Sequence, residues 1–351
     1  MGRKDVFEEK LQVNECPLFA SIFVSGFILI GTIKVYLSCG GGGGGGQNFT
    51  KHASMYFKEK TRNSSGLLHG RRLKSLDVSS PADEQLEISS TSSNLTALDR
   101  EPLKMLSGSC YLPHPDKVAT GGEDAHFICA DEQVIGVADG VGGWKKRGVD
   151  AGVYARELVF NLVRRIKKKP KRSLNPLMVL KKAHSKTNAK GSSTACIIAL
   201  NDNALNAINL GDSGFIVIRG GSVVFKSPVQ QHSFNHPYQL GSEKECDDSS
   251  SGEVFIVPVE PGDVVVAGTD GLFDNLYNEN ITAVVESAIR DRLEPQVTAQ
   301  KIAALAQQRA FDKNWWSPFS AAAHKAGRHY PGGKRDDITV VVSYISSSVS
   351  E

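Results

Sequence analysis

The sequence predicts an α+β fold in which antiparallel sheets and helices form separate layers. From residue 108 onward, apolar runs of strand length alternate with turns rich in Gly and Asp. Hairpin signals, NDN at 201–203 and GG at 220–221, join several of these runs. The helical patterns are grouped after the first strands and late in the chain, which argues against a repeating β-α-β order. About 240 residues are enough for one sizeable core.

Each element is expected from the spacing of its apolar residues. The helix expected over 149–168 ends in a basic run, which suits the negative end of its dipole. The other expected helices cover 177–188, 280–292 and 297–312. The expected strands lie near 125–130, 134–139, 193–200, 204–210, 214–219, 222–226, 253–258, 263–269 and 338–345.

Four of the expected strands carry an aspartate at one end. A single Asp-Gly pair is most often only a turn, but four acids at strand ends indicate a carboxylate cluster on the rim of a sheet. An adjacent pair of acids just before the first strand adds to the cluster. The strand-end acids are Asp139, Asp212, Asp270 and Asp336, and the adjacent pair is Glu123 and Asp124.

These acids have the chemistry of a site for hard divalent cations. No His or Cys accompanies them at ligand spacing, so their oxygens favour Mg²⁺ or Mn²⁺ over zinc or copper. Converging carboxylates repel one another, and a pair of cations removes that cost and activates a water for attack on phosphorus. Gly140, which follows Asp139, leaves its carbonyl available as a further oxygen ligand.

Five motifs occur in a fixed order and carry a family resemblance. They are GEDAH at 122–126, VADGVGGW at 137–144, NLGDSG at 209–214, GTDGLFDN at 268–275 and RDDIT at 335–339. The set, over residues 108–347, resembles the metal-dependent type-2C protein serine/threonine phosphatases (the PPM family), and in particular a subgroup with the DGVGGW motif. The resemblance implies a β-sandwich of two antiparallel sheets flanked by helices, with a two-metal centre at one edge.

The resemblance also implies a role for each acid. Asp139 would bridge both ions, and the catalytic residues would be Asp139, Asp270 and Asp336. Asp124 and Asp337 would lie behind the ligands, and Asp274 would support the turn at Asp270. Asp212 would hold a weaker third ion, so that the full metal set is Glu123, Asp139, Gly140, Asp212, Asp270 and Asp336.

Two positions depart from the family pattern. Val141 stands where many relatives have a histidine that protonates the leaving group, and Ala119 stands where many have an arginine that grips phosphate. His126 is the nearest histidine in sequence, although a core or surface role is expected for it. Lysines that could compensate for the arginine are Lys117, Lys145 and Lys146. The segment between Asp212 and Asp270 is short, so a small flap is expected beside the site.

The expected activity is hydrolysis of phosphoserine and phosphothreonine in protein substrates by a metal-bridged water. A catalytically weak regulatory relative that binds phosphoproteins is the alternative, and a small-molecule phosphatase is a second. The absence of a CxxxxxR loop argues against a cysteine phosphatase. A net charge of +3 gives no reason to expect nucleic acid, and the lack of an obvious dimer helix favours a monomer.

Residues 1–107 are expected to form a disordered N-terminal extension. They contain an uncharged apolar segment at 16–33, a run of glycines at 40–46 and a linker that is first basic and then Ser-rich. The six cysteines show no CxxC pair and read as reduced thiols of an intracellular protein. The composition of 51–75 favours import into a plastid or mitochondrion, with translation from Met55 left open. The alternative is a membrane tether through 16–33, which is at the lower limit of length for a span.

Overall fold

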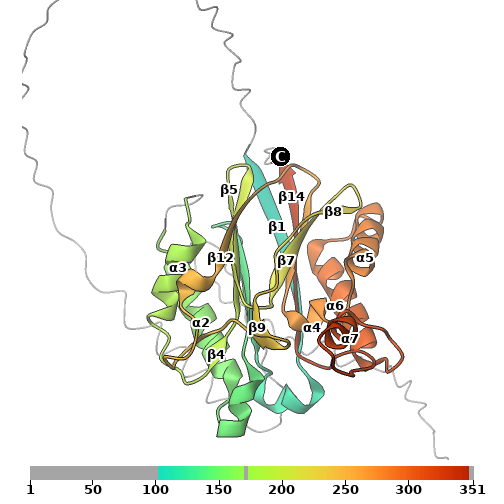
Figure 1. The fold of residues 1–351 in the computed structure, drawn as a ribbon. Helices are drawn as coiled ribbons and strands as arrows, with labels where there is room; N and C mark the ends of the chain where they lie inside the picture. The colour runs from blue at the N-terminus through green and yellow to red at the C-terminus, as the bar shows by residue number, and fades with distance from the viewer. Residues whose placement is uncertain (1–101, 170–172, 348–351) are drawn as a thin grey trace, which may run out of the picture. The chain divides into compact units, whose positions relative to one another are not determined.

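The computed structural model describes residues 102–169 and 173–347, which form two five-stranded antiparallel sheets with helices on their outer faces (Figure 1). The first sheet has the order β12-β6-β5-β3-β2 and the second β1-β14-β13-β7-β8. The strands of the first sheet are β2 (Asp124–Cys129), β3 (Val134–Asp139), β5 (Ala195–Asn201), β6 (Ala204–Leu210) and β12 (Glu253–Pro258). Those of the second are β1 (Leu103–Leu112), β7 (Gly214–Arg219), β8 (Ser222–Lys226), β13 (Val264–Gly268) and β14 (Ile338–Ser347).

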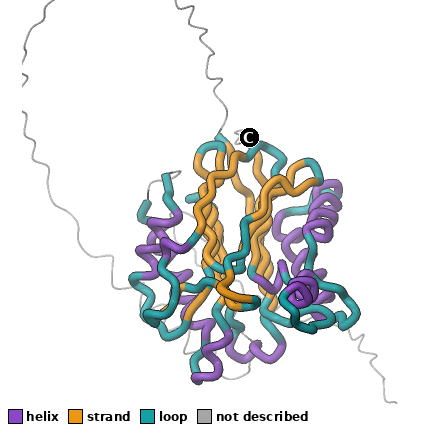
Figure 2. Tube along the Cα trace, in the orientation of Figure 1, coloured by secondary structure: helices purple, strands orange, loops and turns teal. Residues whose placement is uncertain are grey.

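The helices fall into two groups, one beside each sheet (Figure 2). On the side of the first sheet lie α2 (Ala151–Ile166) and α3 (Pro176–His184). On the side of the second lie α4 (Asp270–Phe273), α5 (Asn278–Arg290), α6 (Pro295–Phe311) and α7 (Pro318–Lys325). Shorter elements complete the domain: β4 (Ser192–Ser193) pairs with β11 (Leu240–Gly241), β9 (Gln231–Ser233) pairs with β10 (His236–Pro237), and 3-10 turns cover Pro115–Thr120, Gly142–Arg147 and Ser249–Ser251.

Three apolar layers hold these elements together, one between the sheets and one under each group of helices. The layers follow from the alternation of side chains along each strand. On β13, Val265 and Ala267 face the layer between the sheets, whereas Val264 and Val266 face the layer under α5 and α6. A central strand that is buried on both faces needs a continuous run of apolar residues, and the sequence of β13 is such a run.

The predicted fold class, two antiparallel sheets flanked by helices, is confirmed, but several elements were not predicted. The strand β1 begins at Leu103, so the folded part extends N-terminal to residue 108. Its sequence, LKMLSGSCYL, has Ser and Gly in the middle, which weakens the strand signal. Asp270 was expected to emerge at a glycine turn, but it begins the short helix α4 instead. The helix α7 and the short strands were also missed.

The N-terminal predictions lie outside the described residues. These are the apolar segment 16–33, the glycine run 40–46 and the transit-like composition of 51–75. Within residues 102–169 and 173–347, no helix combines the length and apolar character that a membrane span requires.

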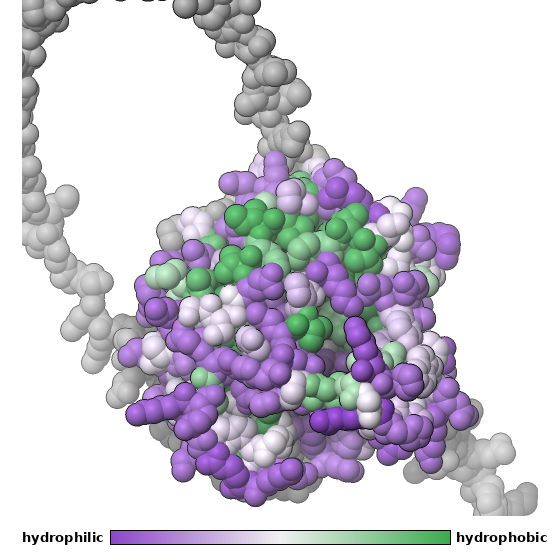
Figure 3. Space-filling model, in the orientation of Figure 1, coloured by the Kyte–Doolittle hydropathy of each residue, from purple (hydrophilic) through white to green (hydrophobic). Residues whose placement is uncertain are grey.

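Apolar side chains gather on the upper part of the face shown in Figure 3. The exposed members include Val224 on β8 and Val254 and Ile256 on β12. These are the edge strands of the two sheets. Polar residues dominate the lower part of the same face, where the functional site lies.

Candidate metal centre

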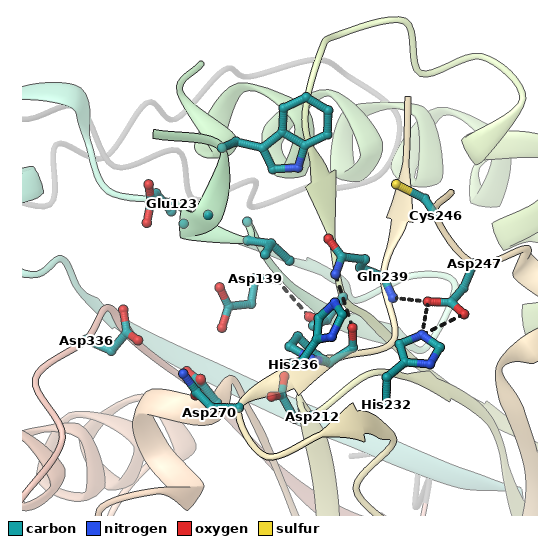
Figure 4. Close-up of a pocket in the computed structure, with 18 of the residues that line it drawn as sticks. Glu123, Asp139, Asp212, His232, His236, Gln239, Cys246, Asp247, Asp270 and Asp336 are labelled. Carbon is teal, nitrogen blue, oxygen red and sulfur yellow. Dashed lines mark hydrogen bonds and ion pairs between the residues drawn. The ribbon is translucent and has the colours of Figure 1, made fainter. Parts of the chain in front are cut away.

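A cavity of about 930 Å³ lies at one end of the sandwich, where acidic residues from both sheets meet. Figure 4 shows the carboxylates of both sheets facing a common space. The acids come from the ends of strands or lie within two residues of one, since Asp139 ends β3, Asp270 follows the last residue of β13 by two positions and Asp336 precedes the first residue of β14 by two positions. All six residues predicted to hold metal line this cavity: Glu123, Asp139, Gly140, Asp212, Asp270 and Asp336. Their role as ligands stays a prediction.

Asp139 is the acid of the cluster whose negative charge is least offset by hydrogen-bond donors or ammonium groups. Among the described residues, its carboxylate receives no hydrogen bond and no ion pair; its hydrogen bonds are made by the backbone, whose N–H donates to the Thr194 hydroxyl at 3.0 Å and whose carbonyl accepts the Thr194 N–H at 2.9 Å. Removal from water, followed by the charges of Asp124, Asp270, Asp336 and Asp212, raises the pKa of Asp139 well above its ordinary value. A carboxylate held in this way favours a cation as its partner.

Asp124 lies directly opposite Asp139 in the pairing of β2 with β3. It is buried, and its Oδ2 accepts hydrogen bonds from the hydroxyls of Thr269 and Thr339 at 2.8 and 2.7 Å. Its Oδ1 has no hydrogen-bond partner among the described residues. The two threonines therefore hold the carboxylate of Asp124 beside Asp139, and the supporting role that the family resemblance implies for Asp124 stays a prediction.

A glycine is needed at position 140 because the backbone of neighbouring segments packs closely against it. A Cβ at this position would lie 2.7 Å from the carbonyl oxygens of both Glu123 and Ala151. The Gly140 N–H donates to the Glu123 carbonyl at 3.0 Å, which ties the two predicted ligands together. The Gly140 carbonyl accepts no hydrogen bond within the described part of the chain, so its oxygen is available to a cation.

Two lysine ammonium groups lie among the carboxylates. Lys117 Nζ is 2.5 Å from Glu123 Oε2 and 3.0 Å from both Asp336 Oδ1 and Asp337 Oδ2. Lys334 Nζ contacts Asp270 Oδ2 at 2.5 Å and Asp274 Oδ2 at 2.7 Å, and it lies 3.6 Å from Asp336 Oδ2. Asp336 is thus shared between the two lysines.

The lysines and Asp336 alter one another's protonation. Burial opposes the charge of Lys334, but Asp270, Asp274 and Asp336 outweigh it and raise the lysine's pKa well above its ordinary value. Burial likewise works against ionisation of Asp336, but Lys334 and Lys117 hold its pKa below the ordinary value. Burial also opposes the charge of Lys117, but Asp336, Asp337 and Glu123 outweigh it and raise the pKa of Lys117 above its ordinary value, so all three groups are charged at neutral pH.

Asp337 supports the ligand positions from behind. Its Oδ2 accepts the Glu123 backbone N–H at 3.0 Å, and its Oδ1 accepts the His114 backbone N–H at 2.7 Å. Asp274 accepts from Lys334, and its own N–H donates to the Asp270 carbonyl at 2.7 Å. Asp337 thus holds the backbone of Glu123, and Asp274 holds that of Asp270, while their roles toward a metal stay predictions.

The rim of the cavity is formed by β9, β10 and the segment that follows them (Figure 4). His232 Nε2 lies 3.0 Å from Asp247 Oδ2, and the same oxygen accepts the Gln239 backbone N–H at 2.9 Å. His232 also stacks on Tyr238 with ring centroids 4.2 Å apart. Gln231 reaches the acids, because its Nε2 donates to Asp212 Oδ2 at 2.9 Å. A small flap was expected beside the site because the segment between Asp212 and Asp270 is short, and β9 and β10 belong to that segment and line the cavity.

Val141, one of the two departures from the family pattern, lines the cavity. Of the two neighbouring lysines that could compensate for the missing arginine, Lys146 lines the cavity and Lys145 does not. His126 is buried and shares a hydrogen bond of 3.1 Å with Ser109, so it has the core role expected for it. Sequence reasoning missed Lys334, and the only signal for it was its position two residues before Asp336.

The donor set fits hard divalent cations. All the acids offer oxygen, Asp139 has no compensating donor in the described part of the chain, and Asp270 Oδ1 is buried there without a partner. As the side chains stand, no three His, Cys, Asp or Glu residues within 102–169 and 173–347 converge closely enough to hold one cation. The ammonium groups lie between them, so bound cations require a rearrangement of side chains.

Comparisons with known proteins identify the family of the chain. Residues 118–308 match the family Protein phosphatase 2C. The chain is 64% identical to Probable protein phosphatase 2C 55 of Arabidopsis thaliana over 79% of its own length, and it spans 59% of that relative's length. The X-ray structure of the photosystem II phosphatase PBCP aligns with a TM-score of 0.65 and 34% identity, covering 69% of this chain and 99% of that one.

A more distant solved structure shares the fold. It is the catalytic domain of the serine threonine protein phosphatase PstP in complex with two manganese ions, with a TM-score of 0.51 and 16% identity. It covers 70% of this chain and 99% of the solved one. The family match and the identities to the first two relatives are what decide membership, and by them the chain belongs to the protein phosphatase 2C family.

Proposed function

We propose that the protein is a metal-dependent phosphatase that hydrolyses phosphoserine and phosphothreonine in protein substrates. The observation that carries this proposal is Asp139, a carboxylate that faces four other acids and has no donor of its own in the described part of the chain. Family membership supports the same reading, because the relatives are protein phosphatases.

The proposed cofactors are two Mg²⁺ or Mn²⁺ ions, with a third, weaker ion at Asp212. The proposed ligands are Asp139, the Gly140 carbonyl, Glu123, Asp270 and Asp336, which all line the cavity. Divalent cations held there supply an acidified water and neutralise the charge of the phosphate. PstP, which shares the fold, holds two manganese ions.

The chain's own residues prepare the reaction in which water oxygen bonds to phosphorus and the serine or threonine oxygen leaves. Thr269 and Thr339 fix Asp124, and Asp337 fixes the backbone of Glu123, so the acids are oriented before substrate arrives. The departing oxygen needs a proton, which Val141 cannot give. The histidines that line the cavity are His232 and His236, so we place the proton donor on this rim.

The proposed setting is intracellular, with phosphoproteins as partners, no nucleic acid and a monomeric protein. A plastid or mitochondrial location is favoured by the composition of 51–75. A membrane tether through 16–33 is the alternative.

Hydrolysis of a phosphothreonine peptide tests the proposal. The full chain is assayed with Mn²⁺, with EDTA and as Asp139→Asn, with the exposed Asp291→Asn as a matched control. We expect turnover that requires the metal, falls ~1,000-fold in Asp139→Asn and is unchanged in the control. Turnover that persists in EDTA would contradict the metal-dependent reading. Metal binding without any turnover would instead favour the regulatory relative, to which Val141 and Ala119 already point.

A further inference from the structure

The carboxylate cluster already contains two internal cations. Lys117 contacts Glu123, Asp336 and Asp337, and Lys334 contacts Asp270 and Asp274. Their side chains are only 21% and 12% exposed, so these ion pairs are shielded from solvent. Shielded charges interact more strongly than surface charges.

The lysines contact three of the acids that the proposed metals require. Glu123 is paired with Lys117, Asp270 with Lys334, and Asp336 with both. On Asp270 the pairing engages Oδ2 and leaves Oδ1 buried without a partner among the described residues. An ammonium group and a divalent cation therefore compete for the same negative charge.

We propose that Lys117 and Lys334 are built-in counter-ions of the carboxylate cluster. Their ammonium groups stabilise the cluster when metal is absent. Divalent cations that bind there must displace these ammonium groups or outweigh their charge. The inference rests on the proposed metal centre and adds how the chain sets the affinity of that centre. In this arrangement the same positive charge raises the stability of the metal-free protein and lowers its affinity for metal.

The geometry allows the exchange without a change of fold. Both lysines line the cavity, so each ammonium group lies beside space that a rotation of its own side chain can use. Lys117 comes from the 3-10 turn at Pro115–Thr120, and Lys334 from the loop before β14. The strands that position Asp139 and Asp270 need not move.

The test measures metal affinity and metal-free stability separately in the full chain. Mn²⁺ binding is followed by calorimetry, and the melting temperature is recorded in EDTA, for wild type, Lys334→Met and Lys117→Met. We expect each variant to bind Mn²⁺ about tenfold more tightly and to melt about 5 °C lower in EDTA. The exposed Lys182→Met, on α3, is the matched control and should change neither value.

The two expected changes, tighter Mn²⁺ binding and a lower melting temperature, distinguish a counter-ion from a lysine that only supports the fold. A lysine that only supports the fold would, when replaced, lower the melting temperature and weaken Mn²⁺ binding together, and that result would overturn the proposal. So would unchanged values in both variants. If wild type itself bound no Mn²⁺, the proposed metal centre would fail first, and this inference with it.

Discussion

His126 joins the two sheets through a polar contact inside the core. It lies on β2, its side chain shares a hydrogen bond with Ser109 on β1, and its ring meets that of Tyr111 edge-on at 6.3 Å. Burial lowers the pKa of His126 to about 4, so the imidazole is neutral in the folded protein at any pH near neutrality. A neutral histidine in the core makes the stability of the domain sensitive to acid.

The stability of the domain should fall between pH 7 and pH 5 partly because of His126. The unfolded chain binds a proton near the ordinary histidine pKa of about 6.5, whereas the folded chain does not until about 4. Acid therefore favours the unfolded state, and the contribution is about 2 kcal/mol at pH 5. Denaturant unfolding of wild type and His126→Gln at both pH values measures it as a difference, in which the titration of other groups cancels.

The exposed His329→Gln serves as the control for that measurement. It should lose as much stability between pH 7 and pH 5 as wild type does, whereas His126→Gln should lose about 2 kcal/mol less. Equal losses in all three proteins would mean that His126 is protonated in the folded state.

At the level of single residues, the sequence identifies the acidic residues of the site better than the lysines that pair with them. Asp139 and Asp270 stand out because each follows an apolar strand and precedes a glycine. Lys334 does not stand out, because a lysine in a polar loop is usually solvated. Its burial arises from contacts with Asp270 and Asp274, sixty-odd residues away, and such contacts exist only in the fold.

The strand β1 forms one edge of the second sheet and depends on α6 to complete its hydrogen bonds. The side-chain amide of Gln296 accepts the Ser109 N–H at 3.1 Å and donates to the Ser109 carbonyl at 2.6 Å. The helix approaches so closely that a Cβ at Gly108 would lie 2.2 Å from the Gln296 backbone nitrogen. Gln296 therefore takes the place of a neighbouring strand at this point of the edge.

Replacement of Gln296 by Ala should destabilise the domain by roughly 1–3 kcal/mol, since it leaves two partly buried backbone groups without their partner. Chemical denaturation of Gln296→Ala and of Gln308→Ala, an exposed position on the same helix, measures the loss. Gln308→Ala should unfold at the wild-type denaturant concentration. A wild-type midpoint for Gln296→Ala would show that water replaces the amide at no cost.

The edge also explains why β1 was not predicted. A strand is recognised from its own sequence by alternation and β-branched residues, and Ser107, Gly108 and Ser109 interrupt both. What orders this segment is its pairing with β14 at the far end of the chain and its contact with α6. By contrast β13, an unbroken apolar run, was predicted within a residue of its observed bounds.

Across the whole domain, the first described strand pairs with the last. Leu103 lies opposite Ser347 and Leu112 opposite Ile338, so β1 and β14 run side by side over their full lengths. Leu103 and Met105 are buried in the layer between the sheets, and Leu112 is buried under the helices. The strand therefore contributes to two of the three apolar layers.

A chain that begins at Pro113 should fail to fold, whereas one that begins at Pro102 should fold cooperatively. Loss of β1 exposes β14 as a new edge and uncovers apolar surface in two layers. Circular dichroism melting of both proteins with Mn²⁺ present measures the difference. A cooperative melt of the shorter protein would show that β1 is dispensable.

The pairing of β1 with β14 also determines which way the cavity faces when the domain is attached to a support or to another protein. Ile338 and Leu112 lie at the end of the pair next to the acids. The other end, at Leu103 and Ser347, lies nine residues away along both strands, about 30 Å at the usual rise per residue. Leu103 and Ser347 therefore lie side by side at the end of the domain opposite the acids (Figure 1). A bead, a fused protein or an anchor joined at either one acts as a handle and leaves the mouth of the cavity pointing outward, open to large substrates.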